Sequence, residues 1–330
     1  MPPSLVGADS FRTFNSDFNR LRYNVVPAGL MAADEPGDAA PPANNTSPPP
    51  ADNQSLGKAP EDNSQWFLRG ETVLLKEGQW EMDYGFEYTW FEQKLPVAAT
   101  PLVERYRQRE WFVPTALRYG LTDNLQPYVN IPWGGTESDL SDFNQEQGVS
   151  KFGLGDISAG LTYLCPEKYC GNTNMVVGLG FSAPTGIAPF SIDPINASLG
   201  SGFWQSTVNV NFITAVDPAV WFWGVGYTHE FAAEHVGQEF QPGEILFYQF
   251  GVGYAINDCI TLSSTFRGQF QGEWKANGTT LPGSSLEPFT LRFAATSTVW
   301  TNQICEPFVQ LGLDSDAPQV DFGILWTHRF

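Results

Sequence analysis

Ionisable side chains recur at alternate positions of this sequence, which is the spacing that places them on one face of a β-strand. The positions predicted to share the polar face are Glu81, Asp83, Glu87, Glu110, Arg118, Asp156, Glu230, Glu244, Arg267, Arg292, Glu306, Asp321 and Arg329. Opposite charges gathered on one face predict ion-pair networks. The same set could line a polar path for ions, and its acidic excess would favour cations.

Residue types suited to catalysis or ligand binding are sparse. His229, His235 and His328 are the three histidines, and no pattern of Ser or Asp pairs one of them with a nucleophile. The Gly-rich run at 153–156 is not followed by a helix pattern, so it does not indicate a nucleotide site. We therefore expect no catalytic residues, no metal and no cofactor.

The four cysteines allow disulfides. Cys165 and Cys170 are close enough in sequence for a short loop to close, and Cys259 could pair with Cys305. Disulfides would require an oxidising compartment. Unpaired thiols are the alternative, whereas a metal site is disfavoured because no His lies near any Cys in the sequence.

Charge and hydropathy exclude several classes of protein. The chain of 330 residues has a formal net charge of -19, which argues against nucleic acid as a partner. No apolar run reaches the roughly 18 to 20 residues of a membrane helix. The start, Met1 to Gly7, lacks the basic and apolar regions of a signal peptide. If the chain is exported, we expect its signal peptide to lie outside this sequence.

The elements that must position the ionisable residues are predicted to be strands. From Gln65 onward, apolar and polar residues alternate in segment after segment, as in 80–90, where Trp80 and Trp90 share the apolar face. About twelve such segments follow, an even number that lets the first and last strands pair in antiparallel fashion. Aromatic residues near strand ends are predicted to form a membrane-interface belt of Trp80, Tyr88, Trp90, Trp111, Trp133, Trp204, Trp221 and Trp223.

Short and long connections alternate between these strands. Short ones lie near 121–124, 217–218, 257–258 and 301–303, and long ones near 93–105, 134–150, 183–202, 232–243 and 273–287. Outer-membrane barrels show this asymmetry, with short turns on the periplasmic side. A soluble sandwich has no reason to keep it, and would expose its aromatic faces to water. The predicted fold is an all-β, transmembrane, antiparallel up-and-down β-barrel of about twelve strands.

Several motifs resemble a known family. They are LLKEGQW at 74–80, GLTDNL at 120–125, GLGDI at 153–157, PTG at 184–186 and GFW at 202–204. Together they resemble an outer-membrane transporter-like family named for the meta-pathway of phenol degradation, over about residues 70–330. The resemblance implies a small channel in the outer membrane of a Gram-negative bacterium, within the lipid bilayer, for hydrophobic or aromatic compounds.

The end of the chain resembles the last strand of such a barrel. Phe322, Ile324 and Trp326 alternate along it, and Phe330 closes it. A terminal Phe is the feature by which outer-membrane barrels are passed to their assembly machinery. The resemblance thus implies that these four residues form the assembly signal, and that the cysteines lie at the periplasmic rim.

Residues 1–64 differ from the rest, since prolines punctuate a stretch rich in Ala, Asn, Asp and Ser that cannot bury a core. We expect a Pro-rich extension at 1–64 and the barrel at 65–330. The extension could plug the lumen or dock a partner. The predicted function is a passive, porin-like channel. The alternative is a structural barrel, plugged by its extension, that forms homo-oligomers or anchors other proteins of the cell envelope.

Overall fold

The computed structural model describes residues 74–96, 103–141, 146–166, 173–190, 197–216, 219–257, 259–300 and 302–330. The predicted extension at 1–64 lies outside these ranges. The regular elements of the described residues are all β-strands, and none of these residues forms a helix able to cross a membrane. The strands of the main sheet are β1 Trp80–Pro96, β2 Val103–Val113, β3 Thr115–Tyr119, β4 Leu125–Asn130, β5 Trp133–Ser141, β6 Glu146–Leu154, β7 Ile157–Leu164, β8 Asn174–Ala183, β9 Gln205–Val216, β10 Ala219–Glu230, β13 Ile245–Asn257, β14 Ile260–Gln271, β17 Phe289–Trp300, β18 Gln303–Gly312 and β19 Val320–Arg329.

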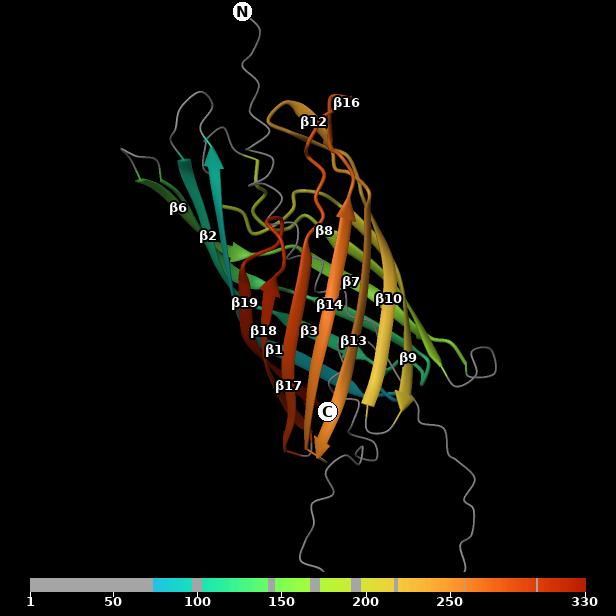
Figure 1. The fold of residues 1–330 in the computed structure, drawn as a ribbon. Coiled ribbons are helices and arrows are strands. Elements are labelled where there is room, and N and C mark those ends of the chain that lie inside the picture. The colour runs from blue at the N-terminus through green and yellow to red at the C-terminus, as the bar shows by residue number, and fades with distance from the viewer. Residues whose placement is uncertain are drawn as a thin grey trace, which may run out of the picture.

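These strands close into an antiparallel barrel (Figure 1). The first strand, β1, pairs with the last, β19, in a register that runs from Glu81 opposite Arg329 to Trp90 opposite Val320. Three spans are each divided into two strands, namely β2 and β3, β4 and β5, and β6 and β7. The 15 strands of the sheet therefore make twelve spans. The predicted fold class and strand number are confirmed.

Each divided span breaks at a residue that interrupts a strand ladder. Pro114 separates β2 from β3, and Pro132 lies between β4 and β5. Proline lacks the N–H that a ladder needs, which explains both breaks. The third break, between β6 and β7, falls at Gly155 and Asp156. Since the three spans are neighbours in the sheet, the breaks form one line across this part of the wall.

Beyond these breaks the wall extends past the rest of the barrel. Trp90 is the last residue of β1 that pairs with β19, but β1 continues to Pro96 beside β2. We call residues 91–96, 103–110, 136–141 and 146–151, from β1, β2, β5 and β6, the projecting sheet. Figure 1 shows β2 and β6 rising from the barrel at the upper left. Within the described residues, β5 is the single ladder partner of β6.

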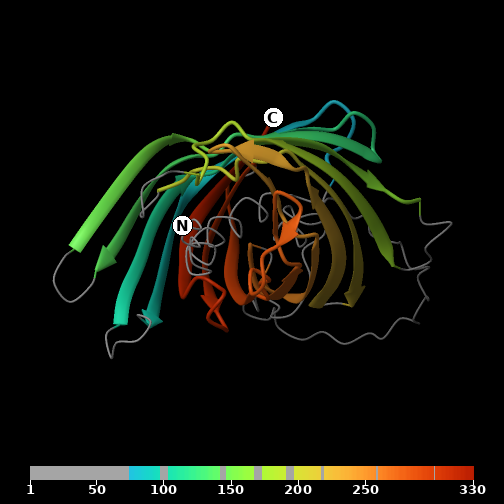
Figure 2. The ribbon, with the colours of Figure 1, turned by 90° about the horizontal axis from the view of Figure 1, so that it is seen from above.

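Two hairpins form a cap at the same end of the barrel. Their strands, β11 Ala233–His235, β12 Gln238–Gln241, β15 Lys275–Ala276 and β16 Thr279–Thr280, make a separate four-stranded sheet. Seen from above, the orange hairpin lies inside the outline of the barrel (Figure 2). Phe203 and Trp274 are fully buried beneath the cap. The His235 ring stacks on Phe190 with ring centroids 3.8 Å apart.

Candidate functional site: the barrel lumen

The two faces of the wall differ in chemistry, as the alternation predicts. The outward face is apolar, with large side chains such as Trp221 at 57% exposure and Phe250 at 56%. The inward face is polar and mostly buried. Strand alternation makes these two faces from one sequence, because successive side chains point to opposite sides. An apolar outside and a polar inside are the properties of a barrel that spans a membrane.

A cluster of four charged residues lies inside the barrel near the seam between β1 and β19. Arg118 Nη1 donates a 2.6 Å hydrogen bond to Glu81 Oε1, and its other terminal nitrogen contacts Asp83. Arg329 Nη2 lies 2.8 Å from the second Glu81 oxygen. Glu81 and Arg118 are 1% and 3% exposed, so water screens this network little. The structure therefore brings together four of the residues predicted to line the lumen.

A second group lies on β17 and β18. Arg292 Nη2 is 2.9 Å from Glu306 Oε1, and the hydroxyl of Thr296 donates a 2.7 Å hydrogen bond to Glu306 Oε2. The Arg292 guanidinium also sits 4.1 Å from the centre of the Phe308 ring. Three more of the predicted lumen residues act on Arg292 through their charges. These are Glu87, Arg267 and Asp321.

Uncharged polar groups continue the inner face along the neighbouring strands. Gln205 donates a 2.9 Å hydrogen bond to Glu230, and the hydroxyls of Thr207 and Thr228 are 2.8 Å apart. Such cross-strand pairs stabilise a sheet from its inner side. Glu230 therefore lies on the buried, polar side of the wall.

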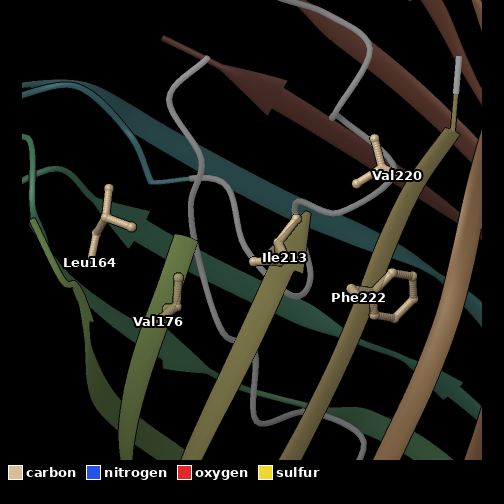
Figure 3. Close-up of a cluster of buried hydrophobic side chains, with 5 residues drawn as sticks. All are labelled: Leu164, Val176, Ile213, Val220 and Phe222. Carbon is tan, nitrogen blue, oxygen red and sulfur yellow. The ribbon is translucent and has the colours of Figure 1, made fainter. Parts of the chain in front are cut away.

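Four strands place apolar side chains on this inner face near their short-turn ends. The cluster consists of Leu164, Val176, Ile213, Val220 and Phe222, with Leu74 packed against it (Figure 3). The sequence analysis missed this cluster. Its signal was the run at 220–223, where Val, Trp, Phe and Trp make both strand faces apolar. The cluster forms a buried apolar patch on an otherwise polar inner face.

The first described residues form a strap across the same end of the barrel. The backbone N–H of Leu75 donates a 2.9 Å hydrogen bond to the Gln126 side chain, and the N–H of Gly78 bonds to the Gly120 carbonyl at 2.8 Å. Leu75 is 1% exposed. The chain therefore passes along the inner wall before it enters β1.

Asp156 has a role that strand parity did not predict. Its carboxylate, 3% exposed, accepts hydrogen bonds from the backbone N–H of Gly186 at 2.8 Å and from the N–H and hydroxyl of Ser201. Thr185 adds bonds to the backbone on either side of it, at Gly155 and Ile157. Asp156 thus fixes the connection between β8 and β9 to the break between β6 and β7.

The prediction that Glu244 faces the lumen is wrong. Its carboxylate bonds to the Tyr227 hydroxyl at 2.5 Å and to His229 Nδ1 at 3.0 Å on the outer, exposed side of the rim. The residue follows β12 rather than lying within a wall strand, so strand parity did not apply to it. Burial opposes ionisation of Glu244, but these two hydrogen bonds and the charge of Lys275 hold its pKa below the ordinary value.

The aromatic belt residues are found on the outer face. The exposed fractions of Trp80, Trp90, Trp111, Trp133, Trp204, Trp221 and Trp223 range from 39% to 57%. Tyr88 lies against Phe322 of the last strand, with ring centroids 5.4 Å apart. In that strand, Phe322 is exposed, Ile324 and Trp326 are partly so, and Phe330 is 65% exposed. Their role in assembly stays a prediction.

The candidate disulfide between Cys259 and Cys305 is absent. Cys259 immediately precedes β14, Cys305 lies on β18, and β17 runs between these two strands. Two strand spacings amount to about 9.6 Å, beyond the roughly 7 Å between Cα atoms that a disulfide can bridge. The Cys165 to Cys170 disulfide stays a prediction, because Cys170 lies outside the described residues. Among the residues placed in the structure, no cluster of three His, Cys, Asp or Glu side chains could hold a metal.

Comparison with known proteins places this fold among outer-membrane barrels. A family model described as "Putative MetA-pathway of phenol degradation" matches residues 103–319. An outer membrane channel from Pseudomonas putida F1 superposes with a TM-score of 0.60 at 14% identity, covering 78% of this chain and 97% of that one.

Two other solved structures superpose less well. The monoaromatic hydrocarbon channel CymD gives a TM-score of 0.40 at 9% identity, covering 78% of this chain and 89% of its own. The toluene transporter TbuX from Ralstonia pickettii gives 0.37 at 13% identity, covering 78% and 90%.

Proposed function

The chain belongs to the family described by the phenol-degradation model, as its motifs led us to expect, and on this premise we propose that it is a passive channel of the bacterial outer membrane. Small solutes, aromatic ones among them, pass through its lumen. The observation that carries the proposal is the contrast between an apolar, aromatic-rich outer face and a buried inner face lined with ion pairs. An outer-membrane barrel has a polar interior both where it conducts and where it is plugged, so conductance is the property that separates a channel from an anchor.

The acidic excess of the lumen supports a preference for cations. The network around Arg118 and Arg329 is balanced, with two carboxylates and two guanidinium groups. The excess comes from the rest of this face, where Glu87, Glu110, Glu230, Glu306 and Asp321 outnumber Arg267 and Arg292. Buried carboxylates raise the local concentration of cations. The test is the reversal potential of the full chain in a planar bilayer under a salt gradient. Its sign shows whether cations or anions pass more readily. Clear anion selectivity would contradict it.

The apolar cluster around Phe222 supports aromatic or hydrophobic solutes. It lies on the inner side of the wall near the short-turn end and spans β7, β8, β9 and β10. An apolar ring gains from contact with such a surface because apolar area leaves water. Relative to protein-free liposomes, which phenol already crosses, liposomes containing the full chain should gain more permeability to phenol than to a sugar of similar size. Phe222→Asn should remove that difference, whereas Phe250→Asn, on the outer face, should not.

The second candidate is a structural barrel whose lumen is plugged by residues 1–64. The strap supports this candidate, because its first residues, Leu74 and Leu75, lie against the inner wall of the barrel. Single-channel conductance of the full chain, compared with a variant lacking residues 1–64, separates the two candidates. Conductance only after deletion indicates a plug. Silence of both indicates an anchor, which could work as a homo-oligomer or with other envelope proteins.

The proposed orientation puts the short turns in the periplasm and the cap outside the cell. The assembly machinery of the outer membrane recognises the last strand, which ends in Phe330. A Cys165 to Cys170 disulfide would form in the oxidising periplasm. Thiol labelling of whole cells tests both points. A disulfide-bonded pair should react with a membrane-permeant thiol reagent only after reduction. A periplasmic pair should not react with a membrane-impermeant reagent even after reduction.

A further inference from the structure

The outward face of the projecting sheet carries a row of arginines directly beyond the aromatic belt. Arg105, Arg107 and Arg109 occupy alternate positions of β2, and Trp111 follows on the same face. The register sets Arg109 opposite Trp90 on one side and Glu137 on the other. The side chains of Arg105 and Arg109 are 50% and 36% exposed.

The change from aromatic to charged residues is abrupt. One side-chain step along this face separates Trp111 from Arg109, a rise of about 7 Å along the strand. Trp90 lies beside Arg109, Trp111 one step below it and Trp133 beside Val113, and all three are well exposed. Exposed tryptophans of a barrel lie at the headgroup level of the membrane. The three arginines consequently stand at the height of the lipid headgroups, or just beyond.

Carboxylates share this face with the arginines. Glu92 Oε1 lies 3.5 Å from Arg105 Nε, and Arg109 contacts Glu137 at 3.2 Å and Asp139 at 3.3 Å. Arg105, Arg109 and Glu137 are 36% to 51% exposed, whereas Glu92 and Asp139 are 23% and 13% exposed. Water reaches the arginine side of each pair, so these guanidinium groups can exchange partners. Arginine binds phosphate through two parallel hydrogen bonds, and carboxylates bind divalent cations. The face therefore matches a layer in which phosphates and divalent cations alternate.

We propose that this face binds the phosphate groups of a phosphorylated glycolipid of the outer leaflet, of the lipid A class. Arg105, Arg107 and Arg109 take the phosphates. Glu92, Glu137 and Asp139 hold the divalent cations that remain between neighbouring headgroups. This contact fixes the barrel in its leaflet and does not depend on whether the lumen conducts.

The test measures how tightly two lipids bind in detergent to the full chain and to variants of it. The probes are bisphosphorylated lipid A and the same lipid without its phosphates, in buffer with Mg²⁺. Wild type should prefer the phosphorylated lipid at least tenfold. The variant Arg105→Gln, Arg107→Gln, Arg109→Gln should bind it about a hundredfold more weakly, because a basic residue near a lipid surface contributes about fivefold each.

A matched control removes three positive charges elsewhere. Lys76, Lys151 and Lys275 are exposed and lie off this face, so their triple replacement by Gln should leave lipid A binding unchanged. A heat-modifiable gel shift checks that each barrel is folded. Equal binding of the two lipids, an unaffected arginine variant, or an equal loss in the lysine variant would overturn the proposal.

The carboxylates are tested through Mg²⁺. Chelation should weaken binding to wild type, and the variant Glu92→Gln, Glu137→Gln, Asp139→Asn should no longer respond to chelation. Persistence of the Mg²⁺ response in this variant would overturn the role given to the carboxylates. Self-association of the chain that the arginine variant abolishes, without any effect on lipid binding, would show that the face pairs with a second copy instead.

Discussion

Arg118 and Glu81 face each other across neighbouring strands, with Arg118 Nη1 2.6 Å from Glu81 Oε1 and both side chains almost fully buried. Arg329 approaches the same carboxylate from the other side. Glu81 therefore links three strands of the wall, β3, β1 and β19. This arrangement keeps two carboxylates and two guanidinium groups in place where little water can reach them.

Arg118→Met should destabilise the barrel by about 3–5 kcal/mol, since removal of one partner leaves a buried charge uncompensated. Urea unfolding in lipid vesicles, followed by tryptophan fluorescence, measures the change. The control is Arg105→Met, whose ion pair with Glu92 is half exposed and should cost at most about 1 kcal/mol. Similar losses of stability in both variants would mean that burial of the Arg118 network does not increase the cost of removing its arginine.

Gly120→Ala should detach the strap from the wall. A Cβ at this position would come within 2.1 Å of the Lys76 carbonyl oxygen and 2.8 Å of its carbon, and backbone cannot move aside cheaply. The bonds around Gly78 and Leu75 should weaken, and hydrogen exchange at residues 74–80 should accelerate. Gly153→Ala is the control, since its Cβ would make only ordinary contacts at 3.7 and 3.8 Å. Unchanged exchange in Gly120→Ala would contradict this account of the strap.

Asp156→Ala should release the connection between β8 and β9. It removes the acceptor for three hydrogen bonds, and bonds to a charged group contribute about 1.5–3 kcal/mol each. Hydrogen exchange of the amides of Gly186 and Ser201 should rise sharply, and the cap should lose some protection with them, because Phe190 and Phe203 of this connection pack against it. Asp123→Ala removes only the exposed bond from Glu77 at the opposite end, so it should leave Gly186 unaffected. Protection of Gly186 in both variants would exclude Asp156 as the clamp.

Acidification should loosen the cap through His235. Burial lowers the pKa of this imidazole, and its hydrogen bond to the Gly202 carbonyl only partly offsets the effect. The closed cap therefore binds fewer protons than the open one, so its stability falls as the pH drops below about 6.5, the ordinary histidine pKa.

Hydrogen exchange of residues 233–241, corrected for the intrinsic effect of pH, measures this loss. His235→Phe keeps the ring stacked on Phe190 but cannot take up a proton, so the pH dependence should disappear. A variant with the same pH dependence as wild type would place the responsible group elsewhere in the cap.

The number of strands, and the side of the wall on which each side chain lies, could be predicted from the sequence because period-two alternation is a local property. Trp80 to Trp90 carries it without reference to any other residue. The breaks at Pro114 and Pro132 were also visible as prolines inside predicted strands, though the pattern ran through them. The lumen residues within strands could be chosen by parity for the same reason.

Other features depend on contacts between residues far apart in sequence. Asp156 gained its partners at Gly186 and Ser201 from a connection whose path no local pattern records. The cap core of Phe203 and Trp274 joins two loops more than 70 residues apart. Glu244 was misplaced because parity holds only inside a strand. Contacts between distant residues therefore determine these features, which the alternation of apolar and polar residues does not predict.

The pairing of β1 with β19 also sets the order of events in folding. Its ion pair between Glu81 and Arg329 spans 248 residues, and the entropy of closing such a loop costs about 5 kcal/mol by chain-length scaling alone. Until the last strand arrives, both ends of the sheet keep unsatisfied backbone donors and acceptors. We therefore expect the seam to form last, with the ion pair between Glu81 and Arg329 holding the first and last strands together once they meet.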